Sequence, residues 1–563
     1  MHSPVKDLNI KPYLTYRVLY PSRPQLEKND IIEYIKYRNA DILLMGLSML
    51  TRCSKEMKSS LEMKFYVRHR PDNDSLLYRN SVHYELFSMQ TLMVAMKWLI
   101  FYGNFHGVNK LLYCFDDRKN EILIESIYFS IIIADTICDD LNQSKDRSIW
   151  DNAVPHIQKN AYINNNDISS LQYAIVRSLV FFRDIPEEKS FKEDKDYIDI
   201  RSTFFYRYGY SLEEYLSQIM VLYLFEDPEG PRVMGKYYSF IPKVLEQYIE
   251  EGRFNDLTID LNDARGQLEK GLDDNYSLKL FWQYLFLRTS ANSVIAMNFE
   301  PYIKKVFINL KFYVAGLYEG KKKNQCLAFM GKIQERYIYE MIKESLDTKS
   351  VKVYSEMFFD SNTNKTPDTI VDIGGKILLV IESKNQSVKE KALFHDDVEA
   401  YIVEEKRLAL KPLEQTLKCL EKMAASHSPE LNKIDIKSFH HIYLFSVINE
   451  GFNVNPYRQP AIHDAANTMI QSFFLNKKIR GYFTVGVSQL EKIISWLFTD
   501  QFKVSPKIVL KKLDALFQSS LSIDDFSSQN GIRLPDVRYL AHRERYLKDL
   551  INVISRRASN EIK

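Results

Sequence analysis

Residues 366–386 read TPDTIVDIGGKILLVIESKNQ and carry the clearest structural signal in this chain of 563 residues. Two apolar, β-branched runs flank the pair Gly374-Gly375, which is the pattern of a β-hairpin. Asp368 stands before the first run, and Glu382-x-Lys384 ends the second. Residues two apart on a strand point to the same face, so the side chains of Glu382 and Lys384 are expected together on one side of the sheet.

The length of the hairpin loop decides whether the two acids meet. A two-residue turn at Gly374-Gly375 would pair Asp368 with Ile381 and place Asp368 and Glu382 on opposite faces. A three-residue loop, 374–376, pairs Asp368 directly with Glu382, and directly opposed residues share a face. Glycines at the first two loop positions suit the longer loop. A site built on both acids therefore predicts the three-residue loop.

The residue types indicate metal-assisted chemistry. Two carboxylates at one strand spacing repel each other unless a cation lies between them. Hard oxygen ligands favour Mg²⁺, with Mn²⁺ as a substitute. Such a metal polarises a phosphate oxygen and lowers the pKa of a bound water. Lys384, on the same face, would stabilise the charge that develops on the phosphorus group. The hairpin therefore predicts a Mg²⁺-dependent phosphodiesterase, against the alternative of an ordinary hairpin with solvated charges.

The segment resembles the core of the PD-(D/E)xK phosphodiesterase superfamily, the restriction-endonuclease-like nucleases, over about residues 322–500. The resemblance implies an α/β core with a mixed central sheet. It assigns the motif aspartate to Asp368, the second acid to Glu382 and the motif lysine to Lys384. The final strand and helix, YFTVGVSQLEKII, also resemble the way in which many of these domains end.

Further site residues follow from the resemblance. Family members often carry an acid on the helix before the strands, where Glu335 stands, although a solvated helix face is the alternative. Nucleases of the RecB type carry a glutamine on the helix after the motif, which Gln415 matches, followed four residues later by tyrosine, where this chain has Cys419. The predicted catalytic residues are Asp368, Glu382, Lys384 and Gln415. The predicted metal ligands are Asp368, Glu382, Ser383 and Glu335.

Two other acids compete for a place in this site. Asp372 lies on the same strand face as Asp368 and is either a neighbour of the metal or a charge at the strand end. Glu356, on the preceding predicted strand, is a weaker candidate.

Three segments are expected along the chain: 1–320 mostly helical, 321–500 the α/β nuclease domain, and 501–563 a short helical basic extension. In the first segment, apolar residues recur at helical spacing in the stretches 86–96, 122–138, 168–182, 212–225 and 280–297. Charged stretches at 184–200 and 250–276 are expected as surface loops or domain seams. In the second, the pattern predicts helices at 325–346, 396–424 and 488–497 and strands at 351–359, 369–373, 377–381, 441–447 and 481–487.

Composition narrows the class of protein. The net charge is only +3, so the chain as a whole does not attract nucleic acid strongly. Contacts with DNA would come from local basic patches such as Lys321–Lys323 or the basic helix 538–557. The five cysteines are scattered, without zinc or disulfide spacing, which favours a cytoplasmic protein. The longest apolar stretch, 86–102, contains Gln90 and Lys97 and predicts a buried helix, so no membrane association is expected.

The leading hypothesis is a Mg²⁺-dependent DNA endonuclease. Its architecture resembles that of restriction or antiphage effectors, in which a sensing module, here 1–320, is joined to a nuclease. Two alternatives remain open: an RNA-directed nuclease with the same three residues, and a scaffold or binding protein with a degenerate nuclease fold. A homodimer or a partner protein is also left open.

Overall fold

A computed structural model defines two compact units. The first contains the described residues within 1–156 and 220–302, and the second contains those within 157–219, 303–393 and 397–563. The structure describes residues 14–560 except 52–54, 70–85, 107–118, 143–170, 226–250, 253–254, 276, 291–292, 298–306, 347–349, 390–391, 393–399, 401–402, 405, 450–458, 500–504, 520 and 544.

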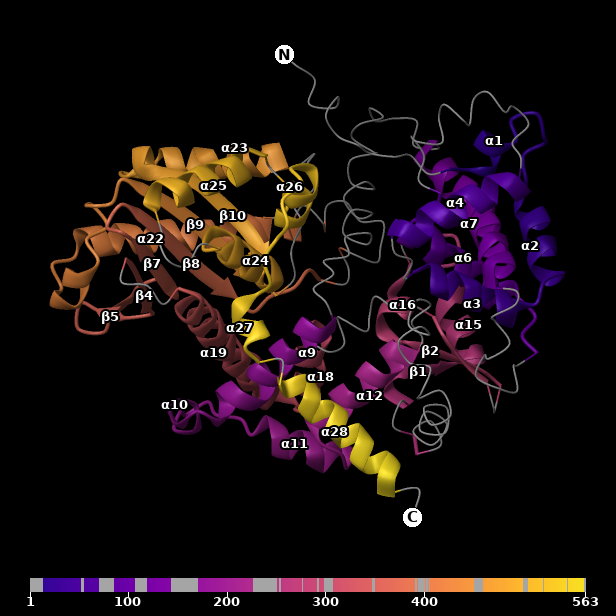
Figure 1. Cartoon of the computed structure of the whole chain (residues 1–563), viewed down its shortest axis with the longest axis horizontal. Helices are drawn as coiled ribbons and strands as arrows, with labels where there is room; N and C mark the ends of the chain where they lie inside the picture. Colours follow the sequence, from indigo (N-terminus) through magenta and orange to yellow (C-terminus); the bar gives the residue numbers. More distant parts are fainter. Residues whose placement is uncertain are drawn as a thin grey trace. The chain divides into compact units, whose positions relative to one another are not determined.

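The first unit is mainly helical and carries one small sheet (Figure 1). Its helices are α1 (Tyr16–Leu19), α2 (Lys28–Lys36), α3 (Ala40–Leu50), α4 (Lys55–Arg68), α6 (Met89–Tyr102), α7 (Lys119–Asn142), α15 (Leu261–Glu269) and α16 (Lys279–Gln283), with the short 3-10 helix η5 (Asn255–Leu257). Its strands are β1 (Thr258–Asp260), β2 (Phe286–Ser290) and β3 (Ser293–Ala296). The helices predicted at 86–96 and 122–138 are confirmed as parts of α6 and α7.

Helix α6 is buried along nearly its whole length, as its apolar sequence requires. The charged residue of α6, Lys97, is also fully buried, and its ammonium donates to the carbonyls of Gly271 at 3.0 Å and Asp274 at 2.6 Å. These bonds offset the cost of removing the charge from water. Within the described ranges, no helix is long and apolar enough to cross a bilayer.

Two predictions for the first unit are wrong. The stretch 280–297 is not one helix, because α16 ends at Gln283 and is followed by the antiparallel pair β2 and β3. The stretch 250–276 is not a plain loop, because it contains β1, which pairs in parallel with β2, and helix α15. Short apolar runs are compatible with helix or strand, and pairing between distant segments settled the choice here.

The second unit is built on a five-stranded mixed sheet in the order β10-β9-β8-β7-β4 (Figure 1). Strands β4, β7 and β8 are antiparallel neighbours, whereas β8, β9 and β10 are parallel. The strands are β4 (Val351–Ser355), β7 (Thr369–Ile373), β8 (Ile377–Lys384), β9 (His441–Ile448) and β10 (Ile479–Gly486), and β5 (Phe358–Phe359) and β6 (Asn364–Lys365) form a separate small hairpin. All five strands predicted in this region are confirmed, the first of them split into β4 and β5.

The helices of the second unit include those that cover the sheet and others that pack farther from it (Figure 1), and α12 continues past the boundary at residue 219. They are α9 (Leu171–Leu179), α10 (Lys189–Lys192), α11 (Ile200–Tyr208), α12 (Leu212–Phe225), α18 (Ile308–Ala315), α19 (Gly320–Ser345), α22 (Lys411–Ala425), α23 (Gln459–Gln471), α24 (Val487–Leu497), α25 (Pro506–Ser519), α26 (Ile523–Gln529), α27 (Arg538–Ala541) and α28 (Arg545–Asn560). Single π or 3-10 turns are η3 (Val180–Asp184), η4 (Ile185–Glu187), η6 (Lys406–Leu410), η7 (Pro429–Lys433) and η8 (Asn476–Lys478). The helix predicted at 396–424 is regular only from Lys411, and part of 396–405 lies outside the described residues.

Strand alternation assigns the two faces of the sheet. Ile370, Leu378 and Val380 lie on one face and pack with Leu413 and Leu417 of α22 in a buried apolar cluster. Residues of the opposite parity face α19 and α25: the Ser383 hydroxyl contacts α19, and the Tyr443 hydroxyl contacts α25. The sheet is therefore covered on both faces, as strands with few polar residues require.

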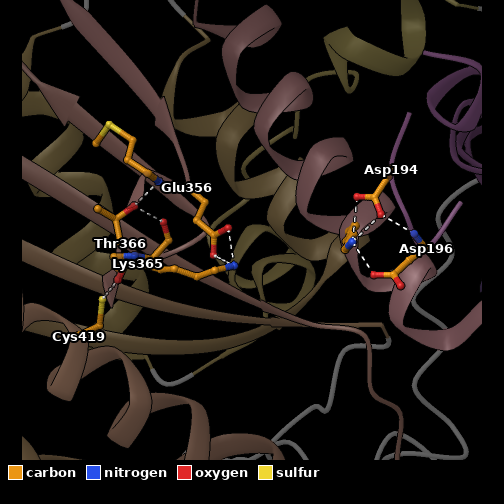
Figure 2. Close-up of polar contacts among 9 residues, drawn as sticks. Asp194, Asp196, Glu356, Lys365, Thr366 and Cys419 are labelled. Atoms are coloured by element: carbon orange, nitrogen blue, oxygen red, sulfur yellow. Dashed lines mark hydrogen bonds and ion pairs between the residues drawn. The ribbon is translucent and has the colours of Figure 1, made fainter. Parts of the chain in front are cut away.

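The contacts divide the chain differently from the three predicted segments. Residues 157–219 and 303–320, predicted to belong to the N-terminal helical segment, cluster with the sheet, and so does the C-terminal extension. The stretch 184–200, predicted as a surface loop or a domain seam, contains η4 and α10 and packs against α19. Its carboxylates Asp194 and Asp196 each lie 2.9 Å from the ammonium of Lys332 (Figure 2).

Candidate active site

The hairpin β7–β8 has the loop length that a two-acid site requires. Thr369 pairs with Ile381 and Ile373 with Ile377, so residues 374–376 form a three-residue loop. Gly374 and Gly375 adopt φ values of 63° and 66°, which favour glycine. The same register places Asp368 opposite Glu382, as predicted.

Asp368 is held at the start of β7 by a hydrogen bond from the opposite strand. The backbone N–H of Ser383 donates to Asp368 Oδ2 at 2.6 Å. Burial raises the pKa of Asp368 well above its usual value, and the negative charges of Glu382 and Glu335 raise it further. The hydrogen bond and the ammonium of Lys384 oppose this rise only in part. Asp368 therefore lies in a crowded acidic environment that a cation would relieve.

Glu382 and Lys384 lie on the same face of β8, as their spacing predicts. Lys384 Nζ donates to Glu382 Oε1 at 2.7 Å, and the two side chains are 25% and 15% exposed. Burial by itself would lower the pKa of Lys384, but the charges of Glu382, Asp368 and Glu335 outweigh it and raise this pKa. The ammonium is therefore retained as a cation beside the acids.

Glu335 joins this group from helix α19. Burial raises the pKa of Glu335 to about 7, with further contributions from the charges of Glu356 and Glu382. Lys365 and Lys384 lower it in part. The structure thus brings Glu335, Asp368, Glu382 and Lys384 into one electrostatic neighbourhood. Of the two alternatives for Glu335, the half-buried position facing the acids is the one observed.

Ser383 faces away from the acids. Its buried hydroxyl accepts a hydrogen bond from Gln334 Nε2 on α19 at 3.0 Å. Gln334 is fixed in turn by the buried ammonium of Lys311, which lies 2.7 Å from Gln334 Oε1 and 2.6 Å from Asn449 Oδ1. The hydroxyl of Ser383 therefore does not face the predicted metal site. Ser383 contacts the site through its backbone N–H, which donates to Asp368.

Helix α22 contributes Cys419 rather than Gln415 to the immediate surroundings of the acids. Gln415 is exposed on the outer side of the helix. Cys419, one turn further on, donates from Sγ to the Lys365 carbonyl at 2.9 Å. Burial raises the pKa of the Cys419 thiol to about 12, and the charges of Glu382 and Asp368 add to this effect. A neutral thiol thus stands where the resemblance implies a tyrosine.

The competing acids have other contacts. Asp372 accepts a hydrogen bond from the N–H of Gly375 at 2.7 Å and so closes the hairpin loop. Glu356 forms an ion pair with Lys365, whose Nζ lies 2.9 Å from Glu356 Oε2 (Figure 2). Lys365 was not among the predicted site residues, although it stands only three residues before Asp368. That proximity in the chain was the one available signal.

The residues present fit a divalent ion in their chemistry. Among the described residues, no group of three or more His, Cys, Asp or Glu side chains is arranged to hold a metal. Mg²⁺, however, keeps several water ligands and is commonly bound through only one or two carboxylates. Asp368 and Glu382 supply two. Burial is the main cause of the raised pKa of Asp368, and the repulsion by Glu382 and Glu335 that adds to it is what such an ion would reduce.

No family model matches the sequence, and no curated protein or solved structure is significantly similar to it.

Proposed function

We propose that this protein is a Mg²⁺-dependent nuclease that hydrolyses phosphodiester bonds in DNA. The observation that carries the proposal is the register of β7 and β8, which sets Asp368 opposite Glu382 with Lys384 on the same face. The order of elements supports the PD-(D/E)xK class. A helix, α19, precedes an antiparallel trio of strands, and α22 connects that trio to two parallel strands.

Each residue has a definite task in this proposal. The carboxylates of Asp368 and Glu382 would hold Mg²⁺, which when bound supplies an activated water and polarises the scissile phosphate. The Ser383 N–H keeps Asp368 Oδ2 directed toward the site. Lys384 places its positive charge beside Glu382, where it stabilises the negative charge that builds on the phosphate in the transition state. Glu335 adds a carboxyl group whose pKa of about 7 allows it to hold or release a proton near neutrality.

The first unit and the helices around the sheet fit a recognition role in a cytoplasmic restriction or antiphage effector. This part of the proposal rests on the joining of a separate, mainly helical unit to the unit that carries the candidate site. Partners other than DNA are left to experiment.

The test is cleavage by the purified full chain. Plasmid, linear duplex, single-stranded DNA and RNA are incubated with the protein in Mg²⁺ or in EDTA. We expect cleavage of DNA in Mg²⁺ only, with strong loss in Asp368→Asn, Glu382→Gln and Lys384→Ala. Loss of one such electrostatic group is expected to lower the rate by about 10²- to 10³-fold.

A matched control uses Asp372→Asn. Asp372 lies on β7, on the same face as Asp368, but contacts the loop instead of the site acids. This variant should keep its cleavage activity, with thermal unfolding measured for every variant. Folded Asp368→Asn and Glu382→Gln proteins that cut as well as the parent would refute the proposal. Cleavage of RNA and not of DNA would favour the alternative of an RNA-directed nuclease with the same site residues.

A further inference from the structure

A small hairpin stands directly before Asp368. Strands β5 and β6 are joined by residues 360–363, of which Asp360, Ser361 and Asn362 have positive φ between 50° and 65°. Such a backbone is costly for residues other than glycine and persists only where contacts hold it in place. Here the Asp360 N–H donates to Ser428 Oγ at 3.0 Å, beyond the end of α22.

The base of the hairpin is also fixed. Met357 N–H donates to Thr366 Oγ1, and Thr366 N–H donates to the Met357 carbonyl, both at 2.9 Å (Figure 2). The hairpin is therefore a rigid projection held at both ends. A rigid projection can present a side chain to a ligand without the entropy cost of ordering a loop.

The hairpin presents one aromatic ring to solvent. Phe359 is 1% exposed and belongs to the apolar core, whereas its neighbour Phe358 is 46% exposed. The ammonium of Lys365 lies 4.8 Å from the centroid of the Phe358 ring, within the range of a cation–π contact. A single exposed aromatic residue needs no explanation by itself. Phe358 is distinguished by its contact with Lys365, whose charge also acts on Glu335 of the candidate site.

This exposed pair is continuous with the acids. The Lys365 carbonyl accepts from Cys419 Sγ at 2.9 Å, and Lys365 stands three residues before Asp368. Lys422 of α22 donates to Asn364 Oδ1 at 3.0 Å, but Asn364 pairs with the buried Phe359, on the hairpin face opposite to Phe358 and Lys365. The exposed face of the hairpin therefore carries one ring and one ammonium group, and the charge of Lys365 reaches Glu335 of the acid cluster.

We propose that Phe358 and Lys365 bind single-stranded nucleic acid, with an unpaired base stacked on Phe358 and a neighbouring phosphate held by Lys365. The inference rests on the proposed nuclease function and deepens it, because it names the form of the substrate near the cut. Aromatic rings set among cations are the general means of holding single strands. In a duplex the base faces are already stacked on each other, so an exposed ring gains a partner only where the strand is unpaired.

Lys365 remains able to bind a phosphate although it pairs with Glu356. Its side chain is 53% exposed, and an ammonium group has three donors. Exposed ion pairs of this kind are weak, so exchanging the carboxylate for a phosphate costs little.

Binding is tested with the full chain in EDTA, where metal-dependent cleavage does not occur. Fluorescence anisotropy of a short labelled single-stranded DNA is compared with that of the matching duplex. Phe358→Ala should weaken single-strand binding by about tenfold, the loss expected for one stacked base, and leave duplex binding nearly unchanged. Phe358→Trp should restore binding, whereas Phe358→Leu, which keeps the apolar bulk without a ring, should not.

The chain offers a matched control at Phe474. This residue is 52% exposed in the same unit, so Phe474→Ala removes a comparable ring from the surface. It should bind the single strand like the parent. The variant Lys365→Ala should reduce the salt dependence of binding, because one phosphate contact is removed, whereas Lys422→Ala should leave it unchanged.

Several outcomes would overturn the inference: no single-strand binding by the parent, no loss in Phe358→Ala, an equal loss in Phe474→Ala, or rescue by leucine. These outcomes are separable from failure of the proposed function. If the parent cleaves nucleic acid in a metal-dependent way and Phe358→Ala binds the single strand as tightly as the parent, only the binding surface is refuted. Stacking on Phe358 without cleavage of any nucleic acid would refute the nuclease and leave the surface standing.

Discussion

The buried pair Arg177–Glu491 is expected to hold the helices of residues 157–219 onto the sheet. The guanidinium makes two charge-assisted bonds to the carboxylate, with Nε at 2.7 Å from Oε1 and the terminal nitrogen Nη2 at 2.6 Å from Oε2. The Tyr337 hydroxyl donates to the same carboxylate at 2.5 Å. Three helices, α9, α19 and α24, therefore meet at one buried group. We predict that Glu491→Gln loosens this junction.

The expected size follows from burial. The side chains of Arg177 and Glu491 are only 3% and 1% exposed, so water cannot replace a lost partner. Removing one member of such a pair leaves an uncompensated buried charge and costs about 3–5 kcal/mol. Replacing both partners by apolar residues of similar volume removes that charge. The double variant Arg177→Met/Glu491→Leu should therefore lose less stability at this junction than a variant in which only one of the two residues is replaced.

Hydrogen exchange followed by mass spectrometry gives the measurement, because it reports local opening and needs no two-state unfolding of the whole chain. In Glu491→Gln, exchange in the peptides of α9 and α24 should speed up by about a hundredfold or more. The peptide of α3, in the other unit, serves as an internal control and should be unaffected. Unchanged exchange in α9 and α24 would refute the reasoning. A double variant that loses the sum of both single effects would show that packing, not the unpaired charge, sets the cost.

Three further predictions concern the loop, the site and the C-terminal helices. Gly374→Ala should destabilise the protein more than Gly375→Ala in thermal unfolding, because a Cβ at 374 would lie 3.0 Å from Pro506 Cγ, whereas one at 375 meets nothing within 4 Å. The positive φ alone should cost about 1–2 kcal/mol at either position. Equal losses of stability in the two variants would contradict the role of Pro506. The pKa of Glu335 in the folded protein, about 7, lies above its value in the unfolded chain. The stability that comes from its bound proton is therefore present in acid and lost as the pH rises through 7. In EDTA, Glu335→Gln should raise the melting temperature above pH 7 and leave it unchanged in acid. Burial by itself would raise the pKa of Glu344, but hydrogen bonds from Arg543 and His542 lower it, so its contribution is present above the unfolded carboxyl pKa and lost as the pH falls through the folded value. Glu344→Gln should therefore cost about 1 kcal/mol near neutrality and nothing in strong acid, which exchange in α28 would report.

Much of the sheet could be predicted because its signals are local. Apolar, β-branched runs predicted strands β7 to β10, and the spacing of Glu382 and Lys384 predicted their common face. The glycine pair predicted a turn, because left-handed φ values exclude most other residues, and its three-residue length was predicted only from the requirement that both acids share a site. The prediction for 280–297 failed for the opposite reason, since a short apolar run carries no information about whether a distant strand will pair with it.

The division of the chain into two units also could not be predicted from local sequence patterns. Helix α9 shows an apolar stripe, but the stripe does not say which surface it covers. Its contact with the sheet unit depends on Glu491, more than three hundred residues away in the chain.

The sequence by itself determined the two strands of the hairpin and the common face of Glu382 and Lys384, because strand alternation acts between neighbours. The folded structure decided that the loop has three residues, so that Asp368 opposes Glu382. It also decided that Glu335 approaches these acids, that Glu356 lies near Glu335 and that Cys419 donates to the Lys365 carbonyl. It also decided that Gln415 stays outside and that Phe358 is left exposed at the border of the site. The physical reason is that helices dock by burying whole apolar faces, and the position of each polar side chain follows from that packing instead of from its own neighbours in the chain.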